Sequence, residues 1–518
     1  MSEELLSKMT LEEKIGQMIC FAFHGTEYNE QLKILIEDHH IGTIIHFARN
    51  IENLDQIYKL NKAIHEKSKY PMFIGLDHEG GMVRRVMEDI TYLPGAMALS
   101  NATDEELYKI YNQTGKELKI LGFNMNYMPS VDVNNNPYNP VINSRSYSDE
   151  PNMVSKRGGI AAVAMQDALV LPTLKHFPGH GNTSVDSHVG LPIVEDTLEQ
   201  LFETELVPFK EIIKKDIDGV MVAHILYKKI DDELPSSLSY KVITNLLKEK
   251  LGYKKLVITD SLTMSAIYNR YSLKEIVEKG INAGNDIIMF CGKATLDEQE
   301  TIINDFINLV KEGKIKEERI NESVLKILKL KEIYKTKLGK NYLDKEFIKN
   351  NFNQEKELSK LLTKKSISAF VRNELLPINE NDKVLSVFPK INLATLVDNA
   401  TNDCTTIGSI LKCDEIIYDE KENNLENIVQ NASKYDKIIL ATYNTNKDGY
   451  GCKIYNSLDK SKVICVALRS PYDIIHLGEC DNYICSFDCT KESIKAISNA
   501  LLTNEFSVKL PINLNIKK

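Results

Sequence analysis

At 518 residues the chain is too long for one ordinary hydrophobic core, so we expect two domains. Hydrophobic residues make up 43% of the chain, which is typical of a globular protein. The net charge is -9, and lysines and glutamates are interspersed without a sustained basic stripe. This pattern argues against nucleic acid as the main ligand.

The N-terminal segment, residues 1–18, is acidic and amphipathic. It lacks the basic start and the apolar centre of a secretory signal. No apolar run in the chain approaches the length that spans a bilayer. We therefore expect a cytoplasmic protein without a membrane partner.

The first part of the chain alternates short apolar runs with amphipathic helical stretches, the pattern of a parallel sheet built from β-α units. Eight such runs can be recognised, at 18–23, 42–47, 72–76, 125–131, 171–176, 219–224, 256–259 and 286–290. Eight units favour a (β/α)8 barrel of the TIM type, in which catalytic groups lie at the carboxyl ends of the strands. An open, doubly wound sheet remains an alternative.

Polar side chains follow these runs, and in a barrel they would meet at one mouth. The residues at or just beyond the run ends are His24, His46, Asp77, Asp132, Lys175, His176, His224 and Asp260. For four histidines we expect capping or core roles instead, namely His24, His39, His40 and His65.

One stretch, residues 175–192 (KHFPGHGNTSVDSHVGLP), gathers three histidines, a lysine and an aspartate between glycines after an apolar run. Such a loop on a rigid scaffold is a common position for chemistry. His176 and His180 could instead bind a metal, but their spacing does not fit the common binuclear pattern. We expect no metal and no cofactor.

A polar connector follows the helical, basic residues 320–336. We predict a barrel domain over 1–340, a connector over 341–360 and a smaller C-terminal α/β sandwich domain over 361–518. Its expected strands, at 384–388, 415–419, 437–444, 463–468 and 482–487, suggest an open parallel sheet covered by helices. It has no glycine-rich phosphate-binding pattern, so packing or homodimer formation is the expected role.

Nine cysteines are an odd number, and the C-terminal ones follow no paired metal-binding pattern. We expect most cysteines to be reduced and buried. The C-terminal set comprises Cys404, Cys413, Cys452, Cys465, Cys480, Cys485 and Cys489.

The KHFPGHG start at Lys175 and the Asp-Ser-His at 186–188 resemble glycoside hydrolase family 3, and within it the bacterial β-N-acetylglucosaminidases. Four further stretches match in the same order: residues 9–18 (MTLEEKIGQM), 77–85 (DHEGGMVRR), 143–147 (NSRSY) and 257–264 (VITDSLTM). The last third of the chain matches more weakly.

This resemblance implies residue roles. Asp260 would be the nucleophile, and His188, assisted by Asp186, would replace the second carboxylate of the usual retaining pair as the acid and base. Asp77, Arg85, Arg145, Lys175 and His176 would bind the sugar, with weaker support for His224. The competing interpretations are a helix N-cap for Asp260, a surface turn for 186–188 and structural salt bridges for the others.

The resemblance further implies an exo-acting β-N-acetylglucosaminidase that releases terminal GlcNAc from peptidoglycan or chitin fragments. The absence of tryptophan fits a small sugar pocket better than a polysaccharide cleft. The alternatives are a β-glucosidase or β-xylosidase of the same family, transfer to phosphate in place of water, and a catalytically silent sugar-binding protein.

Overall fold

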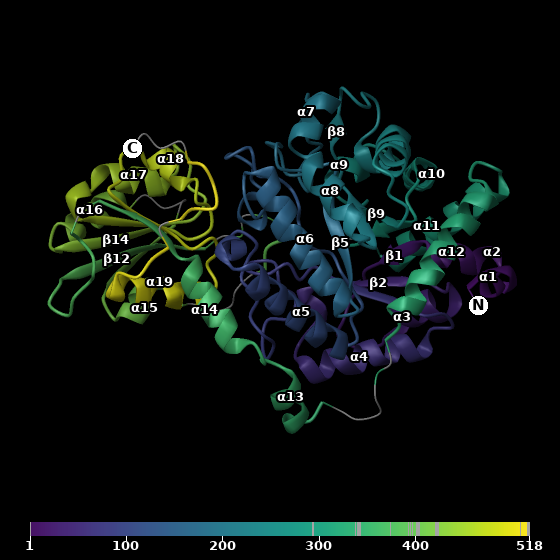
Figure 1. Cartoon of the computed structure of the whole chain (residues 1–518), viewed down its shortest axis with the longest axis horizontal. Coiled ribbons are helices and arrows are strands. Elements are labelled where there is room, and N and C mark those ends of the chain that lie inside the picture. Colours follow the sequence, from purple (N-terminus) through teal and green to yellow (C-terminus); the bar gives the residue numbers. More distant parts are fainter. Residues whose placement is uncertain are drawn as a thin grey trace.

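The structure is a computed structural model, and Figure 1 shows a barrel surrounded by helices beside a second, smaller sheet. It describes residues 2–292, 295–336, 338, 343–372, 374–391, 393, 395, 397–399, 405–419, 424–507 and 509–514. The predicted boundary at 340/341 lies outside these residues, so the division into domains stays a prediction.

Within the described residues, eight parallel strands close into a barrel in the order β1-β10-β9-β7-β5-β4-β3-β2. This confirms the (β/α)8 prediction over an open sheet, and each of the eight expected runs contains or overlaps one strand. The bounds are β1 (Ile19–Phe21), β2 (Thr43–His46), β3 (Phe73–Leu76), β4 (Met125–Asn126), β5 (Leu171–Phe177), β7 (Gly219–Val222), β9 (Leu256–Ser261) and β10 (Ile287–Phe290).

Helices cover the outside of the barrel. Many begin with a capping box, such as Thr103 with Glu106, which satisfies backbone N–H groups at the helix start. The bounds are α1 (Ser2–Lys8), α2 (Leu11–Gln17), α3 (Glu30–Lys33), α4 (Leu54–Lys67), α5 (Asp104–Ile120), α6 (Pro151–Asp167), α7 (Leu198–Glu203), α8 (Leu206–Ile212), α9 (Ser265–Tyr268), α10 (Leu273–Ala283), α11 (Leu296–Lys311) and α12 (Glu317–Ile333). Segments Ile34–Asp38 and Lys241–Lys250 are π-helical. A small pair, β6 (Ile193–Val194) and β8 (Leu226–Tyr227), lies beside the barrel.

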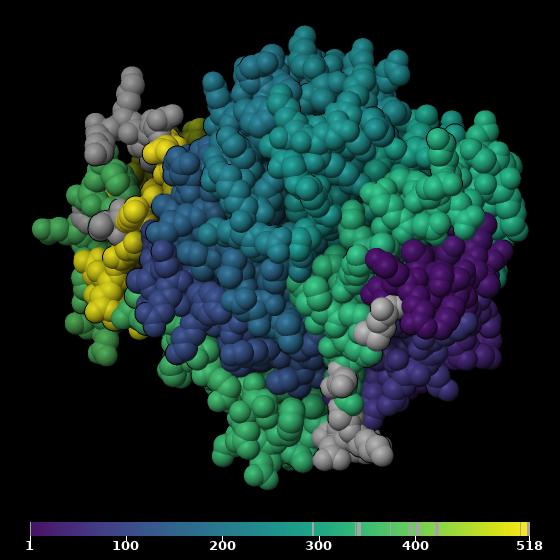
Figure 2. Space-filling model, turned by 45° about the vertical axis from the view of Figure 1, so that its right-hand side comes forward, coloured from purple at the N-terminus to yellow at the C-terminus, as the bar shows by residue number. Residues whose placement is uncertain are grey.

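The first and last helices of the barrel region pack together, α1 against α12 and α2 against both α11 and α12. Figure 2 shows this as the purple N-terminal surface lying against green helices. The chain leaves the barrel through α13 (Lys345–Asn351) and α14 (Lys356–Ser366). Helix α14 then packs against α19 of the C-terminal region.

The C-terminal sheet has six strands within the described part of the chain, in the order β11-β16-β15-β14-β12-β13. The expected parallel arrangement holds for five of these strands, but β11 pairs antiparallel with β16 at the edge of the sheet. The strands are β11 (Ser368–Val371), β12 (Val384–Pro389), β13 (Asp414–Tyr418), β14 (Lys437–Thr442), β15 (Val463–Ala467) and β16 (Asn482–Cys485). The helices are α15 (Ile407–Leu411), α16 (Leu425–Ala432), α17 (Tyr450–Ser457), α18 (Asp473–Leu477) and α19 (Lys491–Thr503).

Both faces of this sheet carry a hydrophobic cluster. Met97 and Ala98 of the barrel region join the cluster on one face, and Met82 joins the cluster on the other. The sheet is therefore packed onto the barrel by apolar contacts as well as by the chain connection.

Among the described helices, none is long and apolar enough to cross a membrane. The described cysteines are free thiols, all buried except the half-buried Cys413, and Cys404 lies outside the described residues.

The glycine-rich loop after β5 packs tightly on the loop after β4. A Cβ atom at Gly181 would lie 1.6 Å from the carbonyl oxygen of Val133, which is backbone and cannot rotate away. At Gly190, in the same loop, the nearest atom to an added Cβ is a side-chain carbon of Val185 at 3.6 Å, an ordinary contact.

We predict that Gly181→Ala lowers the free energy of unfolding by about 2 kcal/mol or more, because one loop must move away from the other. Urea unfolding monitored by circular dichroism measures the change. Gly190→Ala is the matched control and should stay within about 0.5 kcal/mol of the unchanged chain. Equal stability of the two variants would contradict this packing.

Candidate active site

A pocket of about 310 Å³ opens at the carboxyl ends of the barrel strands. Its volume is at the small end of the range for ligand sites, about 300–1,000 Å³. The polar and charged groups around it include Arg49, Asp77, Arg85, Arg145, Lys175, His176, His180, Ser187, His188 and Asp260. Most of the residues nominated from the sequence therefore meet in one place.

Lys175, at the end of β5, is buried between two carboxylates. Its Nζ lies 2.9 Å from Asp77 Oδ1 and 2.6 Å from Glu79 Oε1. The guanidinium of Arg145 holds Glu79 with two hydrogen bonds of 2.9 and 2.7 Å, and Arg85 Nη2 lies 3.3 Å from Asp77 Oδ2. We call these five residues the ion cluster.

Burial alone would raise the pKa of the Asp77 carboxyl, but the charges of Lys175 and Arg85 outweigh it and lower that pKa. Glu79 behaves in the same way, with Arg145 and Lys175 lowering its pKa. Burial lowers the pKa of Lys175, but its two carboxylate neighbours raise it overall. All these groups are therefore charged at neutral pH, and their N–H groups and oxygens are preorganised for a polar ligand.

Asp260 lies at the end of β9 and borders the pocket. Its Oδ1 accepts a 2.7 Å hydrogen bond from the Ser261 N–H. Burial would raise the pKa of Asp260, but His224, His176, His188 and this N–H lower it to about 2. The carboxylate is ionised at neutral pH and can act as a nucleophile.

His224 is buried behind Asp260, and the described pocket lining does not include it. Its Nε2 lies 2.8 Å from the Ser261 carbonyl oxygen and its Nδ1 lies 2.7 Å from Ser237 Oγ. Burial lowers the pKa of this imidazole, which fits a neutral ring that donates to Ser261. In this position His224 supports the end of the Asp260 strand, and the sugar contact expected from the sequence stays a prediction.

His176 lines the pocket, and its ring is held by Asp132, which is fully buried. Asp132 Oδ2 lies 2.7 Å from His176 Nδ1, and Asp132 Oδ1 accepts the backbone N–H groups of His176 and His180 at 3.1 and 2.7 Å. Burial raises the pKa of Asp132, but the contacts with His176 lower it overall. Asp132 thus fixes the orientation of the His176 ring.

His188 and Asp186 form a dyad in the loop after β5. His188 Nδ1 lies 2.8 Å from Asp186 Oδ1, and the same oxygen accepts the His188 N–H at 2.8 Å. The His188 side chain is 21% exposed and lines the pocket, whereas Asp186 is 13% exposed and lies behind it. Burial raises the pKa of Asp186, but His188 lowers it overall, so the dyad holds a carboxylate that can stabilise an imidazolium.

A second histidine, His180, holds this loop together from within. His180 Nε2 lies 3.2 Å from Ser187 Oγ, and His180 Nδ1 lies 2.7 Å from Thr183 Oγ1. Burial lowers the pKa of His180 to about 4, so the ring is neutral at pH 7. The Ser187 carbonyl oxygen also accepts the N–H of Ala266 at 3.3 Å.

Other residues line the pocket or contact its lining without having been nominated from the sequence. Glu79 lay unnoticed in the DHEGG motif, and Arg49 lines the pocket with its guanidinium 4.4 Å from the ring of Phe47. Val397 comes from the C-terminal region, where its carbonyl oxygen accepts a 3.0 Å hydrogen bond from Arg85. Asn399 Oδ1 accepts another from the same guanidinium.

The other strand-end histidines lie elsewhere. His46 is buried between the rings of Phe23 and Phe123, and His24 is exposed, so neither belongs to the described lining. His65 bonds the carbonyl oxygen of Gly122 at 2.9 Å and His39 lies 3.3 Å from Glu300. Among the described residues no group of three His, Cys, Asp or Glu is arranged to hold a metal.

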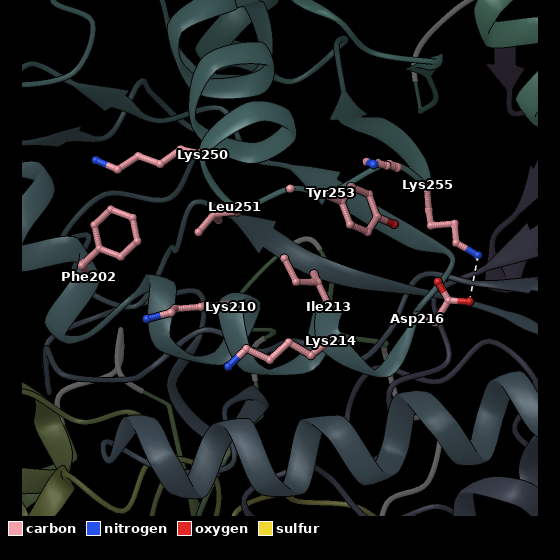
Figure 3. A pocket seen from close by; sticks show the side chains of 11 residues that line it. Phe202, Lys210, Ile213, Lys214, Asp216, Lys250, Leu251, Tyr253 and Lys255 are labelled. Atoms are coloured by element: carbon pink, nitrogen blue, oxygen red, sulfur yellow. Dashed lines mark hydrogen bonds and ion pairs between the residues drawn. The ribbon is translucent and has the colours of Figure 1, made fainter.

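A larger hollow of about 590 Å³ lies at the opposite end of the barrel, next to the residues that precede β7 and β9 (Figure 3). Five lysines border it, and Lys255 is paired with Asp216 at 3.1 Å. Because barrel enzymes place their chemistry at the carboxyl ends of the strands, we assign the site to the smaller pocket.

Comparisons with known proteins agree with this geometry. Residues 10–330 match the family model described as "Glycosyl hydrolase family 3 N terminal domain". The "Beta-hexosaminidase A" of Pseudoalteromonas piscicida is 30% identical over 511 residues, covering 88% of this chain and 84% of that protein. A solved family 3 β-N-acetylglucosaminidase from Paenibacillus sp. str. FPU-7 is 31% identical, with a TM-score of 0.88 over 98% of this chain and 100% of that chain.

A solved β-glucoside phosphorylase, BglX, has a TM-score of 0.84 over 99% of this chain and 96% of its own, but at 19% identity it shows the fold alone. The family model covers well over half of the residues, and the first relative matches over most of both chains. The chain belongs to glycosyl hydrolase family 3.

Proposed function

We propose that the protein is a retaining exo-β-N-acetylglucosaminidase. The main support for this proposal is that two groups lie at one sugar-sized pocket. One is the ionised carboxylate of Asp260, and the other is the dyad of His188 with Asp186. The names of the relatives from Pseudoalteromonas and Paenibacillus support the hexosaminidase activity.

In the first step Asp260 attacks the anomeric carbon, and the bond to the leaving oxygen breaks. The imidazolium of His188 gives its Nε2 proton to that oxygen, while Asp186 keeps the Nδ1–H oriented. In the second step the neutral imidazole takes a proton from water, which displaces Asp260 and releases the sugar. One histidine therefore performs both proton transfers of the retaining mechanism.

The ion cluster and His176 would hold the terminal sugar. Lys175, Arg85 and Arg145 offer N–H donors, and Asp77 offers oxygens on the same wall of the pocket. Because their mutual hydrogen bonds already fix them, little reorganisation is needed on binding. His224 would act indirectly by supporting the end of β9.

The natural substrates would be peptidoglycan or chitin fragments with a GlcNAc at the non-reducing end. The small volume of the pocket favours release of one terminal sugar over cleavage within a long polymer. Water is the expected acceptor. Inorganic phosphate is the alternative acceptor, because the neutral imidazole of His188 would oppose an approaching anion less than a second carboxylate would.

The first prediction concerns the substituent at carbon 2 of the sugar. On 4-nitrophenyl β-glycosides, we expect kcat/KM for the N-acetylglucosaminide to exceed that for the glucoside and the xyloside by about 100-fold or more, since a site built for an amide rejects a ligand without it. Initial rates with the three substrates measure this ratio. Comparable or faster turnover of the glucoside would assign a different activity.

The second prediction identifies the nucleophile. Asp260→Ala should lower kcat by about four orders of magnitude or more, because no covalent intermediate can form. A 2-fluoro glycosyl probe should label the peptide that contains Asp260, as detected by mass spectrometry. Asp297→Ala, at an exposed position on α11, is the control and should react normally. A label on another carboxylate would refute the assignment.

The third prediction tests the proton donor. His188→Ala should slow an alkyl or sugar leaving group by about 10²- to 10⁴-fold. A 4-nitrophenyl group should be affected far less, because it leaves without a proton. The exposed His24→Ala is the control and should leave both rates unchanged. Equal losses on both leaving groups would remove His188 from the acid role.

A further inference from the structure

A second hollow, of about 420 Å³, lies between the barrel and the C-terminal sheet. The barrel contributes residues 137–140 and Asn143, which belong to the Asn-rich loop (131–147). The C-terminal region contributes Pro389 at the end of β12, residues 443–446 after β14, and residues of the segment that follows β15. We call this hollow the inter-sheet pocket.

The pocket lies at a distinctive point of the C-terminal sheet. The chain passes from β12 to β13 on one side and then returns to β14 on the other side of β12. Successive connections therefore diverge at the carboxyl ends of β12 and β14. In open α/β sheets this switch point is the usual position of a ligand crevice.

Two amide oxygens in the lining have no hydrogen-bond partner among the described residues. Asn143 is 5% exposed, and its Nδ2 donates to Ser470 Oγ at 3.0 Å while its Oδ1 has no partner there. Asn444 likewise presents a buried Oδ1 without a partner. Buried acceptors are nearly always satisfied in native proteins by protein groups, ordered water or a ligand, so both oxygens have capacity for a donor from a ligand or a water that it holds.

Aromatic rings also border the inter-sheet pocket. Tyr138 is 62% exposed, and its ring lies 5.7 Å from that of His476. Tyr472 lines the pocket as well and accepts a 3.1 Å hydrogen bond from Asn134. Rings with one free face favour flat, weakly polar surfaces such as the C–H face of a sugar.

The charges around the pocket disfavour an anionic ligand. Lys390 is paired with Asp419 at 3.0 Å, and the lining that the structure describes contains no arginine. Asp473 accepts a 2.6 Å hydrogen bond from Thr442, and burial raises its pKa to about 7. A phosphorylated or carboxylated ligand would therefore find no free cation in this lining.

We propose that the inter-sheet pocket binds a neutral saccharide without cleaving it, through the free amide oxygens of Asn143 and Asn444 and the rings of Tyr138 and His476. Free acceptors match sugar hydroxyl and amide N–H groups, and the rings match a sugar face. The site goes beyond the proposed catalytic function, since the catalytic carboxylate and dyad lie outside its described lining.

The Asn-rich loop separates the two pockets. Its Val141 lines the active site, and its Asn139 donates to the carbonyl oxygens of His180 and Gly181 at 2.8 and 2.9 Å. The same Asn139 also borders the inter-sheet pocket. A saccharide there would contact the loop that supports the catalytic dyad.

The test uses the full-length Asp260→Ala variant, which cannot turn over its ligand, titrated with N,N′-diacetylchitobiose by isothermal calorimetry. We expect two binding events. Adding Tyr138→Ala and His476→Ala should weaken one event by about tenfold or remove it. Adding Tyr240→Ala, a tyrosine elsewhere that is 54% exposed, should change neither event. In the otherwise unchanged enzyme, the paired substitution should leave hydrolysis of the aryl substrate within about twofold.

A single binding event, or two events that the paired substitution leaves unchanged, would overturn the proposal. Equal binding of N-acetylglucosamine 6-phosphate at the second site would overturn the choice of a neutral ligand. If the proposed catalytic function is wrong, the unchanged enzyme will not turn over the aryl substrate. The second binding event is tested independently of catalysis, because it is assigned by its loss in the paired variant.

Discussion

The buried charge of Lys175 constrains the whole mouth of the barrel. Its side chain is 2% exposed, so it requires the carboxylates of Asp77 and Glu79. Those carboxylates in turn require Arg85 and Arg145. Removing one partner from such a buried pair strands a charge and costs about 3–5 kcal/mol, so the five positions depend on one another. The ion cluster thereby ties β3, β5 and the Asn-rich loop into one rigid wall.

The opposite wall of the pocket is held differently. Near His188 the loop of the dyad is held by hydrogen bonds between neutral partners, from His180 to Ser187 and from Ala266 to the Ser187 carbonyl, while its start is bound to the carboxylate of Asp132 through the His180 N–H. Bonds between neutral partners contribute about 1 kcal/mol each, far less than the ion cluster. One wall is therefore fixed by buried charges, while the wall that carries His188 is held by weaker contacts.

Local sequence patterns were sufficient for the barrel and for most of the candidate site. Each barrel strand has a recognisable apolar run, and strand-end positions brought Asp77, Lys175, His176 and Asp260 together. The patterns failed where the partner is distant. The edge strand β11 pairs with β16, more than a hundred residues later in the chain, and nothing in its own sequence indicates the antiparallel direction.

The same limit applies to the C-terminal contribution to the site. Arg85 bonds Asn399, 314 positions away, and neither side of that contact carries a periodicity that identifies the other. His224 shows a different limit, because its ring bonds Ser261 and Ser237 and the ligand contact suggested for it stays a prediction. Residue type and spacing in the sequence thus locate the candidate site. Only the packing in the structure shows which residues border the pocket and which support a neighbouring residue.

The arrangement of the two sheets gives the C-terminal region a role beyond packing. Through Val397 and Asn399 it completes the environment of Arg85, and Asp398 lies 3.3 Å from the buried Arg469 beside the ion cluster. The Asn-rich loop bonds both sides, with Arg145 on the cluster and Asn143 on Ser470. Because the loop bonds both sides, a shift of the C-terminal sheet that keeps the Asn143–Ser470 hydrogen bond must also move the loop that carries Arg145.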